Sequence, residues 1–330
     1  MSPEGGGSSQ PREDAAGEAR REAGRESAFR RLLEARVPPA WRRPRRLVLA
    51  GAVLLAVVVF FIATWPSTTQ PRRLPPGTKV FPVGQRVVLR FVHSTGSVHL
   101  SAGPGGQVTI KEHRNGITDA IHTSYRQQGD VITVKVSIEN GLMLATWVDF
   151  DVAVPPDMTA NVTVPAGTLR AAGLAGTFGL QDTNGSIWAA NVSGVIAMQT
   201  ASGTINTSRV SGQVSAVTDN GTITAISTRL RGHSLLQAQS GTINFHGSLD
   251  PGCRAVFRNT NGATGISLPA GSSVLVDART RSGSINSEFP PVHVVTDPPG
   301  RVARGRLGRG APARLSIQSM AGSIDLSRGT

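Results

Sequence analysis

The chain has 330 residues, including 38 glycines and 21 prolines, with 5% aromatic residues and a formal net charge of +13. This composition favours many turns and thin packed layers over one large globular core. The single cysteine, Cys253, excludes an intramolecular disulfide, and we expect it to be buried as a small apolar side chain. The arginines cluster towards the two ends of the chain: eleven precede Leu47 and five lie within 301–314. A nucleic-acid-binding domain would instead carry a basic face interleaved with aromatics, so the sequence argues against that class.

The first two segments predict a membrane anchor preceded by a basic arm. Residues 1–46 hold few large apolar side chains that could offset the entropy of ordering, which indicates a disordered arm. Leu47–Trp65 then runs for nineteen residues without a charge, and as a helix it would span roughly 28 Å, close to the hydrocarbon thickness of a bilayer. Arginines directly before this segment predict a cytoplasmic N-terminus and an extracytoplasmic C-terminal part. A cleaved signal peptide is the alternative, but the apolar run is long and no clear cleavage site follows it.

After the apolar segment the chain changes to proline and then to short β-branched runs. Residues 66–79 contain four prolines and predict an extended stalk. Residues 80–155 alternate apolar and polar positions between glycine, proline and asparagine turns, which is typical of strands. We expect no helix between Pro66 and Thr330.

Residues 174–287 carry an internal repeat with a period of 18–21 residues. It is recognised by a Gly-Ser/Thr-Ile triplet that begins at Gly185, Gly203, Gly221, Gly241 and Gly283, with a weaker copy at Gly262 and an outlying one at Gly322. A second glycine series lies halfway between these triplets. A fixed period of this length predicts a β-solenoid, in which each coil buries its apolar side chains only by stacking on its neighbours.

Each coil is expected to contain two strands of about five residues, separated by glycine turns. The equivalent isoleucines, among them Ile187, Ile205 and Ile223, should form an inward column, with the preceding Ser or Thr pointing outward. The open strand edges at the two ends need covering. Residues 80–154 should close one end. The Arg- and Pro-rich insertion 290–312, followed by final strands at 313–327, should shield the other.

Candidate catalytic or metal-binding residues are sparse. The acids of the repeat are Asp182, Asp219, Asp250 and Asp277, and we interpret Asp182 and Asp219 as turn residues. The histidines do not have the spacing of zinc ligands, and we expect their side chains to be exposed to solvent. They are His93, His99, His113, His122, His233, His246 and His293. No catalytic, cofactor-binding or metal-binding residue is therefore assigned. Specificity should lie where coils differ, as at Trp188, Arg209, Arg229 and Phe245.

The run Asp151-Val152-Ala153-Val154-Pro155, then Val162-Thr163-Val164 and the Gly-Ser/Thr-Ile units, resembles the bacterial putative-adhesin family of repetitive β proteins. The resemblance covers about residues 87–326. It implies a cell-surface β-solenoid-like domain and transfers no catalytic residue.

These features together predict a membrane-anchored, extracytoplasmic, adhesin-like structural or interaction module rather than an enzyme. Its expected partners are the lipid bilayer through Leu47–Trp65 and an envelope polymer, a surface protein or a second copy of the chain, with no nucleic acid and no cofactor. Two alternatives stay open: an envelope-sensing signalling protein that acts through the basic arm, and, less favoured, a carbohydrate-active β-helix enzyme.

Overall fold

The computed structural model describes residues 77–139 and 146–329, which belong to one compact unit. The predicted arm, the predicted membrane helix at 47–65 and almost all of the predicted stalk lie outside these residues. Within the described ranges, no helix is long and apolar enough to cross a bilayer. Their only helical element is one turn of 3-10 helix at Thr118–Ala120, so the all-β prediction is confirmed.

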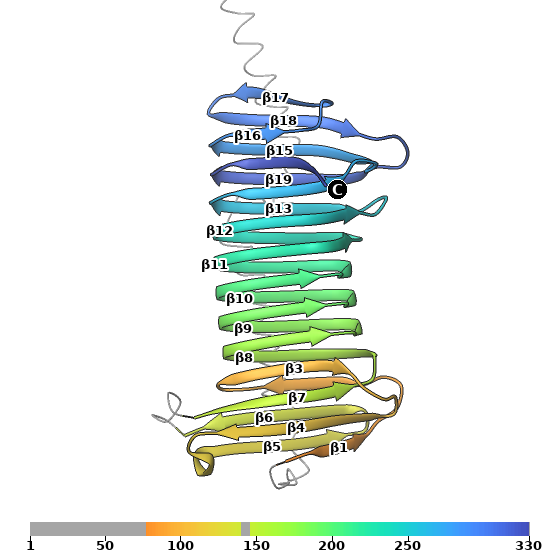
Figure 1. The fold of residues 1–330 in the computed structure, drawn as a ribbon, viewed down its shortest axis with the longest axis vertical. Coiled ribbons are helices and arrows are strands. Elements are labelled where there is room, and N and C mark those ends of the chain that lie inside the picture. Colours follow the sequence, from red (N-terminus) through yellow and green to blue (C-terminus); the bar gives the residue numbers. More distant parts are fainter. Residues whose placement is uncertain (1–76, 140–145, 330) are drawn as a thin grey trace, which may run out of the picture. The chain divides into compact units, whose positions relative to one another are not determined.

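The strands form one continuous, hydrogen-bonded system (Figure 1). Their bounds are β1 (Lys79–Pro82), β2 (Val88–Val92), β3 (Gly96–Ala102), β4 (Gln107–Asn115), β5 (Ile121–Gln128), β6 (Val131–Ile138), β7 (Trp147–Val154), β8 (Asp157–Ala172), β9 (Ala175–Ala190), β10 (Ser193–Ser208), β11 (Ser211–Leu230), β12 (His233–Leu249), β13 (Arg254–Asn261), β14 (Thr264–Pro269), β15 (Val274–Ser282), β16 (Ile285–Ser287), β17 (Val292–Asp297), β18 (Gly300–Leu307), β19 (Ala313–Ala321) and β20 (Ile324–Gly329).

Strands β8 to β12 are the regular coils, and they stack in parallel as predicted. Ile205 pairs with Ile187 of the preceding coil and Ile223 of the next, in register. Each coil is one strand of 16–20 residues bent at its glycine corner, rather than two separate strands of about five. Pairing continues through the corner because each corner glycine meets the corner glycine of the next coil, as Gly203 meets Gly221.

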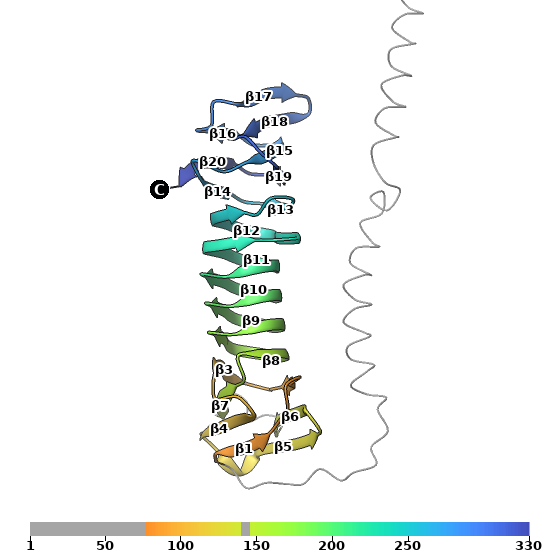
Figure 2. The same cartoon turned by 90° about the vertical axis from the view of Figure 1, so that its right-hand side faces the viewer.

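The bend gives every coil two halves and the stack two layers, which are seen edge-on in Figure 2. We call the layer built from the first halves, such as Val195–Gln199, face A, and the layer built from the second halves, such as 204–208, face B. Side chains alternate inward and outward along both halves. The predicted isoleucine column is buried on face B, with Ile187, Ile205 and Ile223 each at 0% exposure. Face A also has inward columns in register, in which Phe178 is the partner of Ile196.

The corner glycines fill positions that no other residue could occupy without displacing the neighbouring coil. Gly203 has a φ of 149°, and a Cβ placed there would lie 1.8 Å from the carbonyl oxygen of Gly185. The corner where one coil leads into the next accepts residues other than glycine. Asn191, Arg209 and Ser227 lie there and adopt positive φ. The repeat of Gly in the triplet thus reflects close backbone approach as well as turn conformation.

The N-terminal end is closed by residues 79–154, as predicted. The coil formed by β2 and β3 lies between β8 on one side and β6 and β7 on the other. Beyond it, β5 adds to β6 and β4 adds to β7, both antiparallel, and β1 pairs with β4. These antiparallel strands end the parallel stacking.

At the C-terminal end the coils do not stack in the order of the chain. The final coil, β19 and β20, does not follow the insertion at the end of the stack. It lies between the coil of β13 and β14 and the coil of β15 and β16, so that Ile324 separates Thr264 from Ile285. The insertion forms the antiparallel hairpin of β17 and β18, and β18 covers β15.

The pairing register explains this order. Leu307, at the end of β18, lies opposite Val274, the first residue of β15. The hairpin therefore returns the chain to the start of a coil. From there β19 runs parallel to β15 along its other edge, beginning with Ala313 opposite Val274. The insertion shields the stack as predicted, but it also directs the C-terminal coil into the interior of the stack.

Candidate functional site

The acids of the repeat do not converge on a catalytic pair. Asp219 accepts a hydrogen bond from Gln239 Nε2 at 2.7 Å. Asp250 pairs with Arg229 and with Arg231, whose Nε donates at 2.8 Å. These contacts hold the pKa of Asp250 below its ordinary value although burial opposes them. In the ranges that the structure describes, no group of three or more His, Cys, Asp and Glu side chains is placed to hold a metal ion.

Asp182, which we interpreted as a turn residue, lies before the corner but has a buried side chain. The residue is only 5% exposed. The reason is that every second residue of this strand points inward, and Asp182 continues the series of Phe178 and Leu180. The same register position holds Thr200 and, one coil further, Thr218, both buried. A column of polar side chains thus runs inside the stack beside the corners. Burial raises the pKa of Asp182 to about 6, although the backbone amides of its own turn oppose this shift.

Replacing Asp182 by the threonine of the next coil should stabilise the protein at neutral pH. The native carboxyl pKa, about 6, exceeds the ordinary 3.8, so the folded state binds more protons than the unfolded state between these values. Wild type therefore gains stability as the pH falls from 6 to 4. We expect Asp182→Thr to raise the free energy of unfolding by up to about 3 kcal/mol at pH 7.5, and that advantage to vanish by pH 4. Urea unfolding at both pH values measures it, and an equal advantage at both would contradict the assignment.

The expected solvent exposure of the histidines is wrong at His93. Its ring is 2% exposed and packs edge-on against Phe91 and Phe150. Its Nε2 lies 2.7 Å from the carbonyl oxygen of Val148, and desolvation lowers its pKa to about 4. His93 is consequently neutral at pH 7.

Two other histidines meet at one carboxylate. His99 and His113 lie 3.3 and 3.1 Å from the two oxygens of Asp151, with all three side chains about half exposed. Among the described contacts, His93 does not meet His99 and His233 does not meet His246. His233 lies on face A and His246 on face B.

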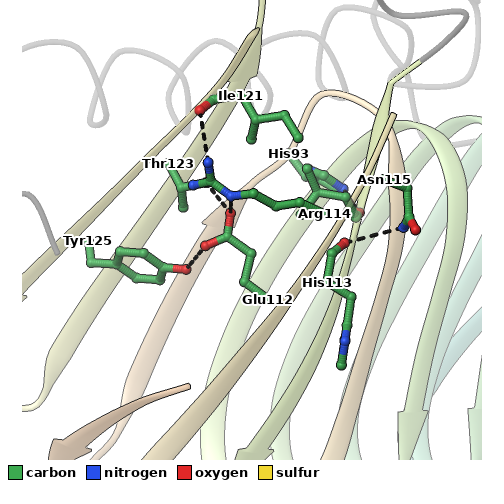
Figure 3. Close-up of polar contacts among 9 residues, drawn as sticks. His93, Glu112, His113, Arg114, Asn115, Ile121, Thr123 and Tyr125 are labelled. Atoms are coloured by element: carbon green, nitrogen blue, oxygen red, sulfur yellow. Dashed lines mark hydrogen bonds and ion pairs between the residues drawn. The ribbon is translucent and has the colours of Figure 1, made fainter. Parts of the chain in front are cut away.

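A buried carboxylate in the N-terminal closure, missed in the sequence, lies at the centre of a network of side-chain hydrogen bonds (Figure 3). The side chain of Glu112 is 0% exposed. It accepts hydrogen bonds from Arg114 Nε at 2.8 Å, Thr123 Oγ1 at 2.7 Å and Tyr125 Oη at 2.7 Å. Burial and the bond to Glu112 raise the pKa of the Tyr125 phenol.

The geometry of this network is structural rather than catalytic. A carboxylate with three donors and no exposed surface cannot reach a substrate proton, which a general base must do. The sequence held one signal for it: Glu112 continues the inward alternation of Val108 and Ile110 along β4. An acid at an inward position indicates a buried partner for the charge.

Other singled-out residues separate into core and surface. Cys253 is 1% exposed, as predicted, and burial raises its pKa to about 11. Phe245, proposed as a specificity position, is instead buried and packs against Phe257 with ring centroids 5.4 Å apart. Arg209 is exposed and donates to Asn191 Oδ1.

Face B carries the most regular polar surface. The Ser and Thr residues that precede the isoleucines point outward as predicted, and Ser186 Oγ lies 3.0 Å from Thr204 Oγ1 of the next coil. The next outward-facing position along each of these halves is two residues further on. It holds Trp188, Asn206 and Thr224, which are in register. Trp188 is 45% exposed, and the guanidinium of Arg170 stands 5.7 Å from its ring centroid.

A groove opens at the far end of face B, where the coils are least regular. A β-bulge between Ile226 and Thr228 shifts the register of β11 against β12, and Ser227 has a positive φ. The groove has a volume of about 800 Å³. Its lining is rich in hydroxyl groups and comes from 226–228, 246–248, Ser267, Pro269 and 327–329. Thus one face combines an exposed aromatic ring, rows of hydroxyl and amide groups, and a polar groove.

Two solved bacterial structures resemble this chain at low sequence identity. One is a putative cell adhesion protein from Clostridium sporogenes, 10% identical, with a TM-score of 0.28 over 77% of this chain and 100% of that chain. Another is a putative adhesin from Bacteroides fragilis, 11% identical, with a TM-score of 0.31 over 76% of this chain and 95% of that chain. No protein-family model and no curated protein matches the sequence. Similarity at these TM-scores assigns neither family nor function, and the adhesin-like character stays a prediction.

Proposed function

We propose that this chain is an adhesin-like interaction module that binds a neutral polysaccharide along face B and catalyses no reaction. In this proposal Leu47–Trp65 anchors the chain in a membrane and the solenoid lies on the extracytoplasmic side. The observation that carries the binding role is Trp188: a large aromatic side chain, nearly half exposed, on a rigid sheet beside rows of hydroxyl and amide groups.

The chemistry of the face suits sugars. An indole ring offers a flat apolar surface with a polar edge, while Ser, Thr and Asn side chains both donate and accept hydrogen bonds. Their spacing follows the strand spacing of about 4.8 Å, so one extended polymer could contact several coils at once. The bulge groove, at the far end of the same face, adds a concave polar surface.

Trp188→Ala should reduce polysaccharide binding at least tenfold without lowering the melting temperature appreciably, because the side chain is nearly half exposed on the outer side of face B. The measurement is a panel of neutral cell-envelope polysaccharides against the full-length chain in uncharged detergent. Trp147→Ala is the matched control, since Trp147 is 44% exposed but lies in β7 of the N-terminal closure. Equal binding by both variants, or no binding by wild type to any member of the panel, would refute the polysaccharide site.

A further inference from the structure

Face A becomes strongly basic at its C-terminal end, although the arginines responsible are far apart in the sequence. β13 contributes Arg254, β19 contributes Arg314, β15 contributes Arg279, and β18 contributes Arg304 and Arg306. All five are exposed and each has a buried residue directly beside it in its strand, so they point outward from one sheet. We call this set, Arg254, Arg279, Arg304, Arg306 and Arg314, the arginine face.

The interleaved coil order is what gathers these charges. Arg254 and Arg314, sixty positions apart, are direct register partners because β19 lies beside β13. Arg314 is opposite Leu275, which in turn is opposite Arg306 on the hairpin. Four neighbouring strands therefore place three arginines on one line that crosses about 14 Å at the usual strand spacing.

The counter-charge within this surface is small. Asp277 accepts two hydrogen bonds of 3.1 Å from Arg279 and lies 3.6 Å from Arg304 Nε. Arg306 donates to the carbonyl oxygen of Gly310 at 2.9 Å. Among residues 77–139 and 146–329, no carboxylate forms an ion pair with Arg254 or Arg314. Like charges directly opposite each other on a sheet are destabilising, so stacking alone does not account for them.

The charge is also local. The same outward row carries Thr177, Val195 and Gln213 in the coils nearer the N-terminal end. Neutral side chains thus satisfy this position wherever only coil stacking is required, and arginine replaces them only at the C-terminal end. The arrangement points to a ligand rather than to packing.

We propose that the arginine face binds a linear polymer of phosphodiester-linked units that lacks nucleobases. A guanidinium matches phosphate oxygens in a bidentate geometry, and aligned arginines can engage successive phosphates of one chain. The face is flat, so one small anion would gain little there, whereas a polymer gains by multivalency and by releasing counterions. Its outward positions include Val256, Ser316 and Gln318 but no Phe, Tyr or Trp on which a base could stack; the only rings beside the arginines are the small imidazoles of His233, opposite Arg254, and His293, opposite Arg304.

This site is separate from the proposed polysaccharide surface, which lies on face B. The test uses the full-length chain in uncharged detergent with poly(glycerol phosphate) as the probe. Single-stranded DNA with the same number of phosphates and poly-glutamate of equal charge are the comparators. The triple variant Arg254→Gln, Arg306→Gln, Arg314→Gln is compared with Arg86→Gln, Lys111→Gln, Lys135→Gln, which removes the same charge from exposed positions of the N-terminal closure.

We expect the arginine-face variant to bind poly(glycerol phosphate) at least tenfold more weakly than both wild type and the control variant. The slope of log K against log salt should fall by about 2, in line with three lost phosphate contacts. Hydrogen exchange should show that the polymer protects peptides of β13, β15 and β19. The basic arm before residue 47 is identical in all three proteins, so it does not contribute to the differences.

Three results would overturn the proposal: equal binding by the two triple variants, protection confined to peptides of the arm, or tighter binding of DNA or poly-glutamate than of poly(glycerol phosphate). Removing the repulsion between Arg254 and Arg314 should leave the melting temperature unchanged or slightly higher. A loss of affinity therefore reports on binding rather than on folding. None of these outcomes depends on Trp188, so this test and the polysaccharide test fail or succeed separately.

Discussion

Gly203→Ala should cost at least about 4 kcal/mol of unfolding free energy, which is enough to prevent folding of a domain with ordinary stability. A Cβ at this position would lie 1.8 Å from the Gly185 carbonyl oxygen and 2.8 Å from its carbonyl carbon. Both are backbone atoms in a paired strand, so neither can move unless two coils separate. The φ of 149° adds strain for any residue with a side chain. Thermal unfolding followed by far-UV circular dichroism measures the loss.

Gly105→Ala provides the matched control. Gly105 lies in the turn between β3 and β4, and a Cβ there would meet nothing within 4 Å. We expect its melting temperature to stay within about 2 °C of wild type, as for most surface substitutions. If Gly203→Ala were equally mild, the coils would have to be more widely spaced at the corner than the structure shows.

Glu112→Ala should be the second most disruptive change, with a loss of about 3–5 kcal/mol. The substitution leaves the Arg114 side chain, only 19% exposed, without its counter-ion and removes the acceptor of the buried Tyr125 hydroxyl. The penalty comes mainly from these stranded donors rather than from the lost pair itself. Because the network lies in the N-terminal closure, hydrogen exchange should increase first in β4, β5 and β6.

The control for this prediction is an acid in the same part of the molecule. Glu139 is 59% exposed and lies 3.3 Å from the equally exposed His122, so Glu139→Ala should change stability by about 0.5 kcal/mol or less. Glu112→Gln, which keeps an acceptor oxygen but not the charge, should fall between the two alanine variants. Equal stability of Glu112→Ala and Glu139→Ala would show that the buried network contributes nothing.

Local periodicity explains how much of the fold could be predicted. The spacing of the triplet glycines determines the coil length, and the alternation around Ile205 determines which side chains point inward. Both are short-range properties, because a strand has a side-chain period of two and stacked identical coils must share one register. The same reasoning placed Ser186 and Thr204 on the outer surface.

The sites were less predictable because they depend on partners that are distant in sequence. Asp182 resembles any acid before a turn, and only the inward alternation of its strand, with burial on all sides, shows that it lies in the interior. Glu112 receives two of its three donors, Thr123 and Tyr125, from β5, eleven and thirteen residues away. Trp188 was singled out as a position that differs between coils, but its place beside the hydroxyl rows required the register between coils.

The amino-acid sequence by itself determined the all-β class, the coil period, the isoleucine column and the need to close both ends, because each follows from a repeating local pattern. Only the tertiary structure decided the order of the last coils. Several orders would bury the same isoleucines equally well. The choice depends on where the β17–β18 hairpin returns the chain, which is a long-range property. That choice places Arg314 beside Arg254 and turns scattered arginines into one basic surface.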